Sequence, residues 1–76
     1  MVEDVRMSLK AARVYGGFSQ SEIAEELDVH RNSYINYEKY QIPMRIDTAI
    51  KFSELTGIPM NNIIFLGNNY TSSVVD

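Results

Sequence analysis

Apolar residues recur at helical spacing from the start of the chain. Val5, Leu9 and Ala12 stand at i, i+4 and i+7 within "VEDVRMSLKAARVY", and two glycines follow directly. This spacing places the three side chains on one face of a helix. Glycine tolerates the left-handed backbone conformation in which helices commonly end. The pattern therefore predicts a first helix over residues 2–15.

A second, short helix begins at a capping signal. Ser19 is followed three residues later by Glu22, the arrangement in which each side chain can bond the other residue's backbone amide. This predicts a helix over Gln20–Leu27. Asp28 comes next, and aspartate is one of the few non-glycine residues that adopt positive φ without much strain. The apolar edge of this helix consists of Ile23, Ala24 and Leu27.

A third helix is predicted from Arg31 to about Lys39, directly after the turn. Tyr34 and Tyr37, with part of Ile35, can face inward together. The opposite face is then wholly polar. It carries Arg31, Asn32, Ser33 and Asn36.

The remaining apolar pattern predicts two more helices and a tail. Pro43 interrupts the chain before a fourth helix that Gly57 ends. Pro59 then suits the start of a fifth, short and very apolar helix, "MNNIIFL" at residues 60–66. Residues 67–76 contain turn formers and no helical period, so we expect a loosely ordered tail after a domain of residues 1–66. The fourth helix shows Ile46, Ala49, Ile50 and Ser53 on one face.

Composition limits what such a chain can do. With 76 residues and 45% hydrophobic content, it has room for a single core. Cysteine is absent, which excludes disulfides and thiolate metal sites. The N-terminus opens acidic and has no uninterrupted apolar run, so we expect neither a signal peptide nor a membrane span, and a cytoplasmic location.

The chain offers no group of residues suited to catalysis. His30 is the one histidine, and no second metal ligand or nucleophile stands at a matching spacing. Glu22, Glu25 and Glu26 share a helix surface, which is the usual solvated acidic face. We therefore expect no enzyme activity, no bound metal and no cofactor.

These elements together carry a family resemblance. The stretches "LKAARVYGGFSQSEIAEELDV" and "HRNSYINYEK" resemble the first two helices and the recognition helix of phage repressors and Cro proteins. The resemblance extends from Leu9 to about Phe65. It implies an all-α, compact five-helix helix-turn-helix domain and binding to double-stranded DNA.

In that family the third helix lies in the major groove of DNA, with its N-terminal residues at the base edges. Arg31 is then placed to donate two hydrogen bonds to a guanine, and Asn32 and Asn36 to pair with adenine edges. Ser33 is a weaker candidate for base contact. The resemblance also places Gln20 at a phosphate or the outermost base. Further backbone contacts are expected from His30, Lys39 and Arg45.

Two other positions acquire meaning from the resemblance. In the family an arginine of the first helix pairs with a glutamate that ends the third, and here Arg13 and Glu38 stand at those positions. Arginine's planar fork suits a carboxylate. Tyr40 stands where the family often has glycine, a departure that is expected to alter the loop after the recognition helix.

The charge of the chain leaves two functions open. A formal charge of −3 is unusual for a DNA-binding protein, because phosphate neutralisation supplies much of the affinity. One function is a sequence-specific regulator, a repressor acting as a homodimer on a pseudo-palindromic operator. The alternative is a protein-interaction module, an antirepressor or modulator of another phage-type repressor. In both cases the surface that contacts the second subunit or the other protein is expected at Ile63, Ile64, Phe65 and Leu66.

Overall fold

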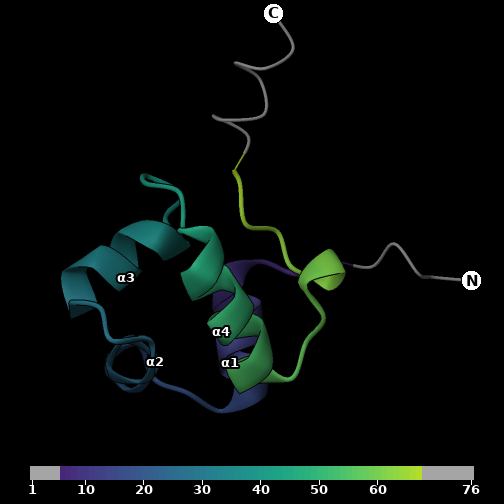
Figure 1. Ribbon diagram of the computed structural model, residues 1–76, viewed down its shortest axis with the longest axis horizontal. Helices are drawn as coiled ribbons and strands as arrows, with labels where there is room; N and C mark the ends of the chain where they lie inside the picture. The colour runs from purple at the N-terminus through teal and green to yellow at the C-terminus, as the bar shows by residue number, and fades with distance from the viewer. Residues whose placement is uncertain (1–5, 68–76) are drawn as a thin grey trace, which may run out of the picture.

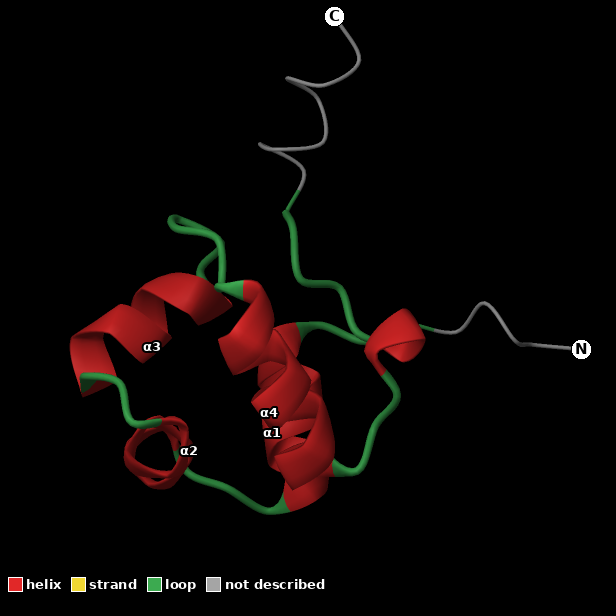
Figure 2. Ribbon diagram, in the orientation of Figure 1, coloured by secondary structure: helices red, strands yellow, loops and turns green. Residues whose placement is uncertain are grey.

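The computed structural model describes residues 6–67, which form four α-helices and one short 3-10 helix. In Figure 1, α4 lies across α1, and α2 is seen end-on below α3. Loops join all of these helices (Figure 2). Within residues 6–67, no helix is both long and apolar enough to cross a membrane. The bounds are Leu9–Gly16 for α1, Gln20–Leu27 for α2, Arg31–Glu38 for α3, Ile46–Thr56 for α4 and Met60–Asn62 for the 3-10 helix η1.

The first helix is shorter than predicted. It begins at Leu9 because Ser8 caps it, with the Ser8 hydroxyl accepting a hydrogen bond from the Ala11 amide at 3.1 Å. Met7, just before the cap, forms a parallel bridge with Ile63 instead of continuing the helix. The expectation that the helix reaches back to residue 2 is therefore wrong for residues 6–8. Val5 lies outside the described residues.

The helix-turn-helix itself follows the sequence prediction. Ser19 and Glu22 form the reciprocal capping box, with hydrogen bonds of 3.0 and 2.8 Å. Asp28 ends α2 in the left-handed conformation, at φ 60°. Tyr34 and Tyr37 are the buried residues of α3. The local signals are strong here because capping and turn geometry involve only neighbours in sequence.

The buried face of α4 differs from the predicted one. Ile46 and Ile50 are 69% and 46% exposed. The predicted face is therefore wrong at both isoleucines and right at Ala49, while Ser53 is half-buried, and the helix is rotated so that Phe52 points inward. Phe52 is the largest apolar side chain of α4, and its ring stacks on Tyr34 with centroids 6.4 Å apart. The buried residues of α4 are Ala49, Phe52 and Thr56.

The predicted fifth helix is wrong. The 3-10 turn η1 spans Met60–Asn62, and Ile63 then adopts an extended conformation at φ −118°. The Met7 amide donates to the Asn62 carbonyl, and the Ile64 amide donates to the Met7 carbonyl, each at 2.9 Å. Pairing with the start of the chain gives these backbone groups partners without a helix. The β-branched isoleucines also favour the extended state.

The core forms where the four helices meet. Leu9, Ile23, Tyr34 and Phe52 are the largest fully buried side chains. Tyr34 lies at the centre, because its ring stacks on Phe52 and meets Tyr37 edge-on at 6.3 Å. Burying an aromatic ring of α3 in this way fixes the helix on the domain and leaves its other face to the solvent.

Candidate nucleic-acid interface

The outer face of α3 presents the side chains predicted to read bases. Tyr34 and Tyr37 are buried, and the helical repeat of 3.6 residues puts Asn32, Asn36 and Lys39 on the opposite side. Arg31 lies at the first turn, where family geometry places base contacts. The burial of two tyrosines therefore determines which polar residues face outward.

These polar side chains are accessible. Arg31, Asn32 and Lys39 are exposed, and Ser33 and Asn36 are partly exposed. Hydrogen bonds from these five side chains do not occur among residues 6–67. Arginine and asparagine carry the donor and acceptor groups that match guanine and adenine edges. The face thus offers several groups that can pair with bases.

Behind this face, the Glu38 carboxylate collects three side chains from three helices. One oxygen, Oε2, accepts from Arg13 Nε and from the Tyr34 hydroxyl at 2.7 Å. The other, Oε1, accepts from Gln20 Nε2 at 3.1 Å. Arg13 also donates to the Phe18 carbonyl at 2.8 Å. The predicted pair of Arg13 and Glu38 is present as one part of this larger network.

The network changes the pKa values of its members. Burial by itself raises the pKa of the Glu38 carboxyl, but hydrogen bonds from Arg13, Tyr34 and Gln20 outweigh it, and the pKa lies below its usual value. The hydrogen bond that Arg13 donates to Glu38 raises the pKa of Arg13. Burial, followed by the bond to Glu38, raises the pKa of Tyr34. Glu38 therefore stays ionised and Tyr34 stays a hydrogen-bond donor at neutral pH.

Gln20 is held by this network at the N-terminus of α2. One N–H of its Nε2 donates a hydrogen bond to Glu38, which leaves the second N–H and the amide oxygen for another partner. The predicted contact of Gln20 with a phosphate remains a prediction. No sequence pattern indicates that Glu38 orients this amide, because the two residues are 18 positions apart.

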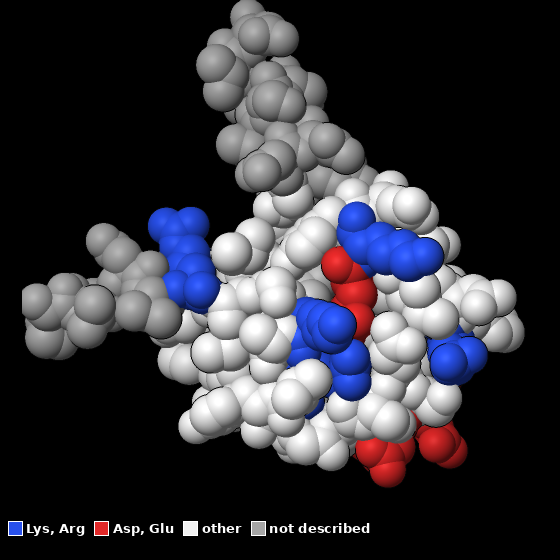
Figure 3. Space-filling view, turned by 180° about the vertical axis from the view of Figure 1, so that it is seen from behind, with Lys and Arg blue, Asp and Glu red and all other residues white. Residues whose placement is uncertain are grey.

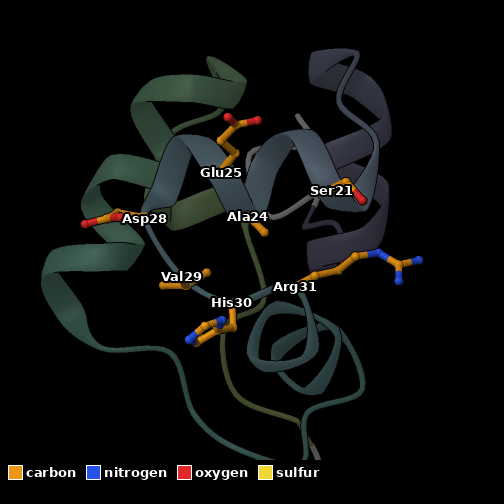
Figure 4. Close-up of a pocket in the computed structure, with 7 residues that line it drawn as sticks. All are labelled: Ser21, Ala24, Glu25, Asp28, Val29, His30 and Arg31. Carbon is orange, nitrogen blue, oxygen red and sulfur yellow. The ribbon is translucent and has the colours of Figure 1, made fainter.

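An open groove of about 480 Å³ lies at the turn between α2 and α3. In Figure 4, Ala24 points from α2 toward the start of α3, and Glu25 points away from it. Asp28 and Arg31 project in opposite directions (Figure 4). The charged residues that line the groove are two acids, Glu25 and Asp28, and one cation, Arg31. His30, predicted to lie near the DNA backbone, is exposed on this side.

The net acidity of the chain arises outside the described residues. All seven lysines and arginines fall within residues 6–67, together with only seven of the ten acidic residues, so this part carries no formal net charge. Figure 3 shows one face with basic side chains spread across it. Acidic side chains appear on it near the centre and at the lower edge (Figure 3). The domain is therefore neutral and mixed in charge.

One of the predicted backbone-binding cations already has a partner. Arg45 Nε lies 3.3 Å from Asp47 Oδ1, and both side chains are largely exposed. The Arg45 hydrogen bond lowers the pKa of Asp47, and a second bond comes from the Thr48 amide. Asp47 also stands in the first turn of α4, where a carboxylate is stabilised by the helix dipole. This pairing was not predicted from the sequence, although the two residues are only two positions apart.

The four residues of the predicted partner surface differ in burial: two lie in or against the core and two are exposed. Ile63 is 5% exposed and belongs to the core. Phe65 packs against that core, with its ring 6.2 Å from Phe52. Ile64 and Leu66 are exposed, at 38% and 53%. Only these last two stay available as a predicted interface.

One residue on the face of α3 was not predicted from the sequence to take part in recognition. Ile35 was assigned partly to the core, but it is half-buried and follows Arg31 by one helical turn. An isoleucine beside polar side chains that contact bases can itself contact the methyl group of thymine. The sequence did not indicate that Ile35 is partly exposed, because it lies next to the buried Tyr34.

The geometry defines a helix-turn-helix domain with an outward-facing third helix. A family model described as helix-turn-helix matches residues 9–63, so the chain belongs to the helix-turn-helix family. The match agrees with the resemblance to phage repressors and Cro proteins. Comparisons with curated proteins and with solved structures gave no match.

Membership of this family makes the chain a DNA-binding transcription regulator. The family's members act by binding DNA and are not enzymes. Among residues 6–67, no group of three or more histidines and acidic residues is placed to hold a metal ion. The functional question is therefore which residues contact DNA and with what result.

The Glu38 network generates a prediction about stability. Arg13→Ala and Glu38→Ala should each lower the free energy of unfolding by about 3 kcal/mol, because each leaves the other charge poorly compensated. The double variant should lose less than the sum of the two. Chemical denaturation measures all three, with the exposed Lys10→Ala on the same helix as control. Strict additivity would contradict the pairing, and unchanged stability with abolished DNA binding would put Arg13 on a phosphate.

Proposed function

We propose that this protein is a sequence-specific transcriptional repressor that binds a pseudo-palindromic operator as a homodimer. The observation that supports this is the rigid seating of α3. Tyr34 and Tyr37 bury one side of the helix, and Glu38 ties its end to α1 and α2. A recognition helix must be held at a fixed angle to place side chains against base edges.

Each side chain of the outer face has a base that suits it. Arg31 donates two hydrogen bonds to guanine O6 and N7, and Asn32 and Asn36 pair with the N6 and N7 edge of adenine. Ser33 lies at the flank, and Ile35 contacts a thymine methyl. The binding site then contains a guanine next to A·T pairs in each half-site.

Phosphate contacts come from the surroundings of α3. Gln20, Lys39 and Arg45 reach the backbone on either side of the recognition helix, and His30 lies at its start. Since the described domain carries no net charge, base contacts and shape must supply more of the affinity than in a basic protein. Repression follows because a protein bound at a promoter occupies the DNA that transcription needs.

Dimerisation is supported by the distribution of exposed apolar residues. Among residues 6–67, five of the seven exposed large hydrophobic residues come from two segments, the loop with α4 and the C-terminal segment. The Tyr40 hydroxyl bonds the Ile64 carbonyl, and the Phe65 ring meets Phe52, so the two segments lie side by side. A two-fold contact here would bury this surface and pair two recognition helices. The five are Ile42, Ile46, Ile50, Ile64 and Leu66.

Base reading by Arg31 is tested by DNA binding. Arg31→Ala should cost about 1–3 kcal/mol on the specific site and relax the preference at one base pair. The control Lys39→Ala should weaken binding on every sequence alike and reduce the salt slope by about one phosphate. Fluorescence anisotropy on DNA from beside the gene, at low and physiological salt, measures both.

Two results would count against this assignment. Uniform weakening by Arg31→Ala would make Arg31 a phosphate contact. Failure of the unaltered protein to prefer any sequence, even at low salt, would remove the operator function and leave the protein-interaction module.

The pair of Arg45 and Asp47 generates a second prediction. Asp47→Asn keeps an oxygen that can accept from the Thr48 amide but removes the charge that holds Arg45. DNA affinity should rise about twofold to fivefold at low salt and less at high salt, because an exposed pair is screened. Glu54→Gln, which removes an exposed charge near the other end of α4, is the control. An equal gain in both variants would show a general charge effect and would not support Arg45 as a phosphate contact.

Assembly can be tested with a charge on the exposed apolar surface. Leu66→Asp should give a folded monomer, because a buried unpaired carboxylate disfavours the two-fold contact. Sedimentation equilibrium measures the mass, and an unchanged melting temperature shows that the fold survives. Val14→Asp, at a residue 59% exposed on α1, should leave the dimer intact. A wild-type protein that stays monomeric at high concentration, with and without DNA, would contradict the dimer.

A further inference from the structure

Tyr40 occupies a backbone position that ordinarily requires glycine. It follows the C-cap of α3 and has a φ of 59°. Its amide donates to the Tyr37 carbonyl and the Gln41 amide donates to the Asn36 carbonyl, both at 3.0 Å, which is the pattern that closes a helix in a left-handed turn. A tyrosine is disfavoured there relative to glycine, so its side chain must contribute something that offsets the difference.

The side chain joins three parts of the domain. The Tyr40 hydroxyl accepts a hydrogen bond from the Leu9 amide at 3.1 Å and donates one to the Ile64 carbonyl at 2.6 Å. The Leu9 amide lies in the first turn of α1, where backbone donors have no partner within the helix. Ile64 is in turn paired with Met7. One hydroxyl thus connects the end of α3, the start of α1 and the C-terminal segment.

The C-terminal segment also lies directly against the Tyr40 side chain. A Cβ atom on Gly67 would approach the Tyr40 Cβ to 2.7 Å, which is closer than packed atoms allow. The chain can therefore pass this point only with glycine. Burial raises the pKa of Tyr40, so the hydroxyl stays protonated and able to donate across the neutral range.

The loop that begins at Tyr40 has few other attachments. Gln41, Ile42 and Pro43 are exposed, and Met44 packs against the core near the end of the loop. The two hydroxyl bonds of Tyr40 tie this loop to α1 and to the C-terminal segment. Lys39 precedes the loop and Arg45 ends it, so its position decides where both cations lie.

We propose that Tyr40 is a positioning residue for DNA binding, which fixes the loop of residues 40–45 so that Lys39, just before the loop, and Arg45, at its end, reach the DNA backbone. Tyr40 itself does not touch DNA. The inference rests on the proposed function, because it concerns the phosphate contacts of that same interface. It assigns a purpose to the departure from glycine that the sequence shows.

The test compares Tyr40→Phe with the unaltered protein. The phenylalanine keeps the ring and the backbone conformation and removes both hydroxyl bonds. The plot of log affinity against log salt should become shallower by about 0.9 for each phosphate that the variant no longer neutralises, with equal weakening on specific and unrelated DNA. The base preference set by Arg31 should not change. Tyr15→Phe, at a tyrosine 73% exposed on α1, is the matched control and should alter nothing.

A second variant separates the hydroxyl from the turn. Tyr40→Gly allows the left-handed conformation without strain but also lacks the hydroxyl, so it should show the same shallower slope. A lower melting temperature with an unchanged salt slope in both variants would show a purely structural role and overturn the proposal. A wild-type slope in Tyr40→Gly alone would assign the positioning to the turn and also overturn it. If the unaltered protein binds no DNA, the proposed function fails and this inference fails with it, whereas the other outcomes leave that function standing.

Discussion

The ionised carboxylate of Glu38 is the constraint on which the arrangement of the helices depends. Its side chain is only 6% exposed, and an unpaired charge at that depth would be strongly destabilising. It is compensated by Arg13 from α1, Gln20 from α2 and Tyr34 from α3 itself. Tyr34 lies one helical turn before Glu38 on α3, whereas Arg13 and Gln20 reach the carboxylate only when α1 and α2 hold their native positions against α3. The network thus makes the orientation of the recognition helix conditional on the whole domain.

Short turns do the rest of the positioning, and they depend on left-handed residues. Gly17 and Gly57 end α1 and α4 at φ 86° and 77°, Asp28 ends α2 at 60°, and Tyr40 follows the C-cap of α3 at 59°. Such turns close the helix ends with backbone hydrogen bonds in very few residues. The helix-turn-helix therefore carries non-glycine residues at both of its left-handed positions. In α3 the side chain at that position is used to hold neighbouring segments together.

The charge distribution explains how an acidic chain can belong to a DNA-binding family. The described domain is neutral, and one of its cations, Arg13, is used inside the Glu38 network. The charge of Arg45 is paired with the Asp47 carboxylate. Long-range attraction to phosphate is therefore weak, and under the proposed function more of the affinity comes from side chains brought to base edges at short range. A rigidly seated α3 matters more under these conditions than in a strongly basic protein.

The sequence alone determined the features that depend on near neighbours. The capping box at Ser19, the left-handed Asp28 and the inward tyrosines of α3 all follow from residues within one or two turns of one another, and the outward polar face follows from them. The resemblance to a known family added the pair of Arg13 and Glu38, which no local pattern reveals. Only the tertiary structure decided the rest. Phe52 determines the buried face of α4 because its ring packs on Tyr34. Ile63 is extended because it pairs with the backbone of Met7, 56 positions earlier. The same holds for Gln20 and Tyr40, whose side chains bond groups 18 to 31 residues away, at distances that only the folded chain defines.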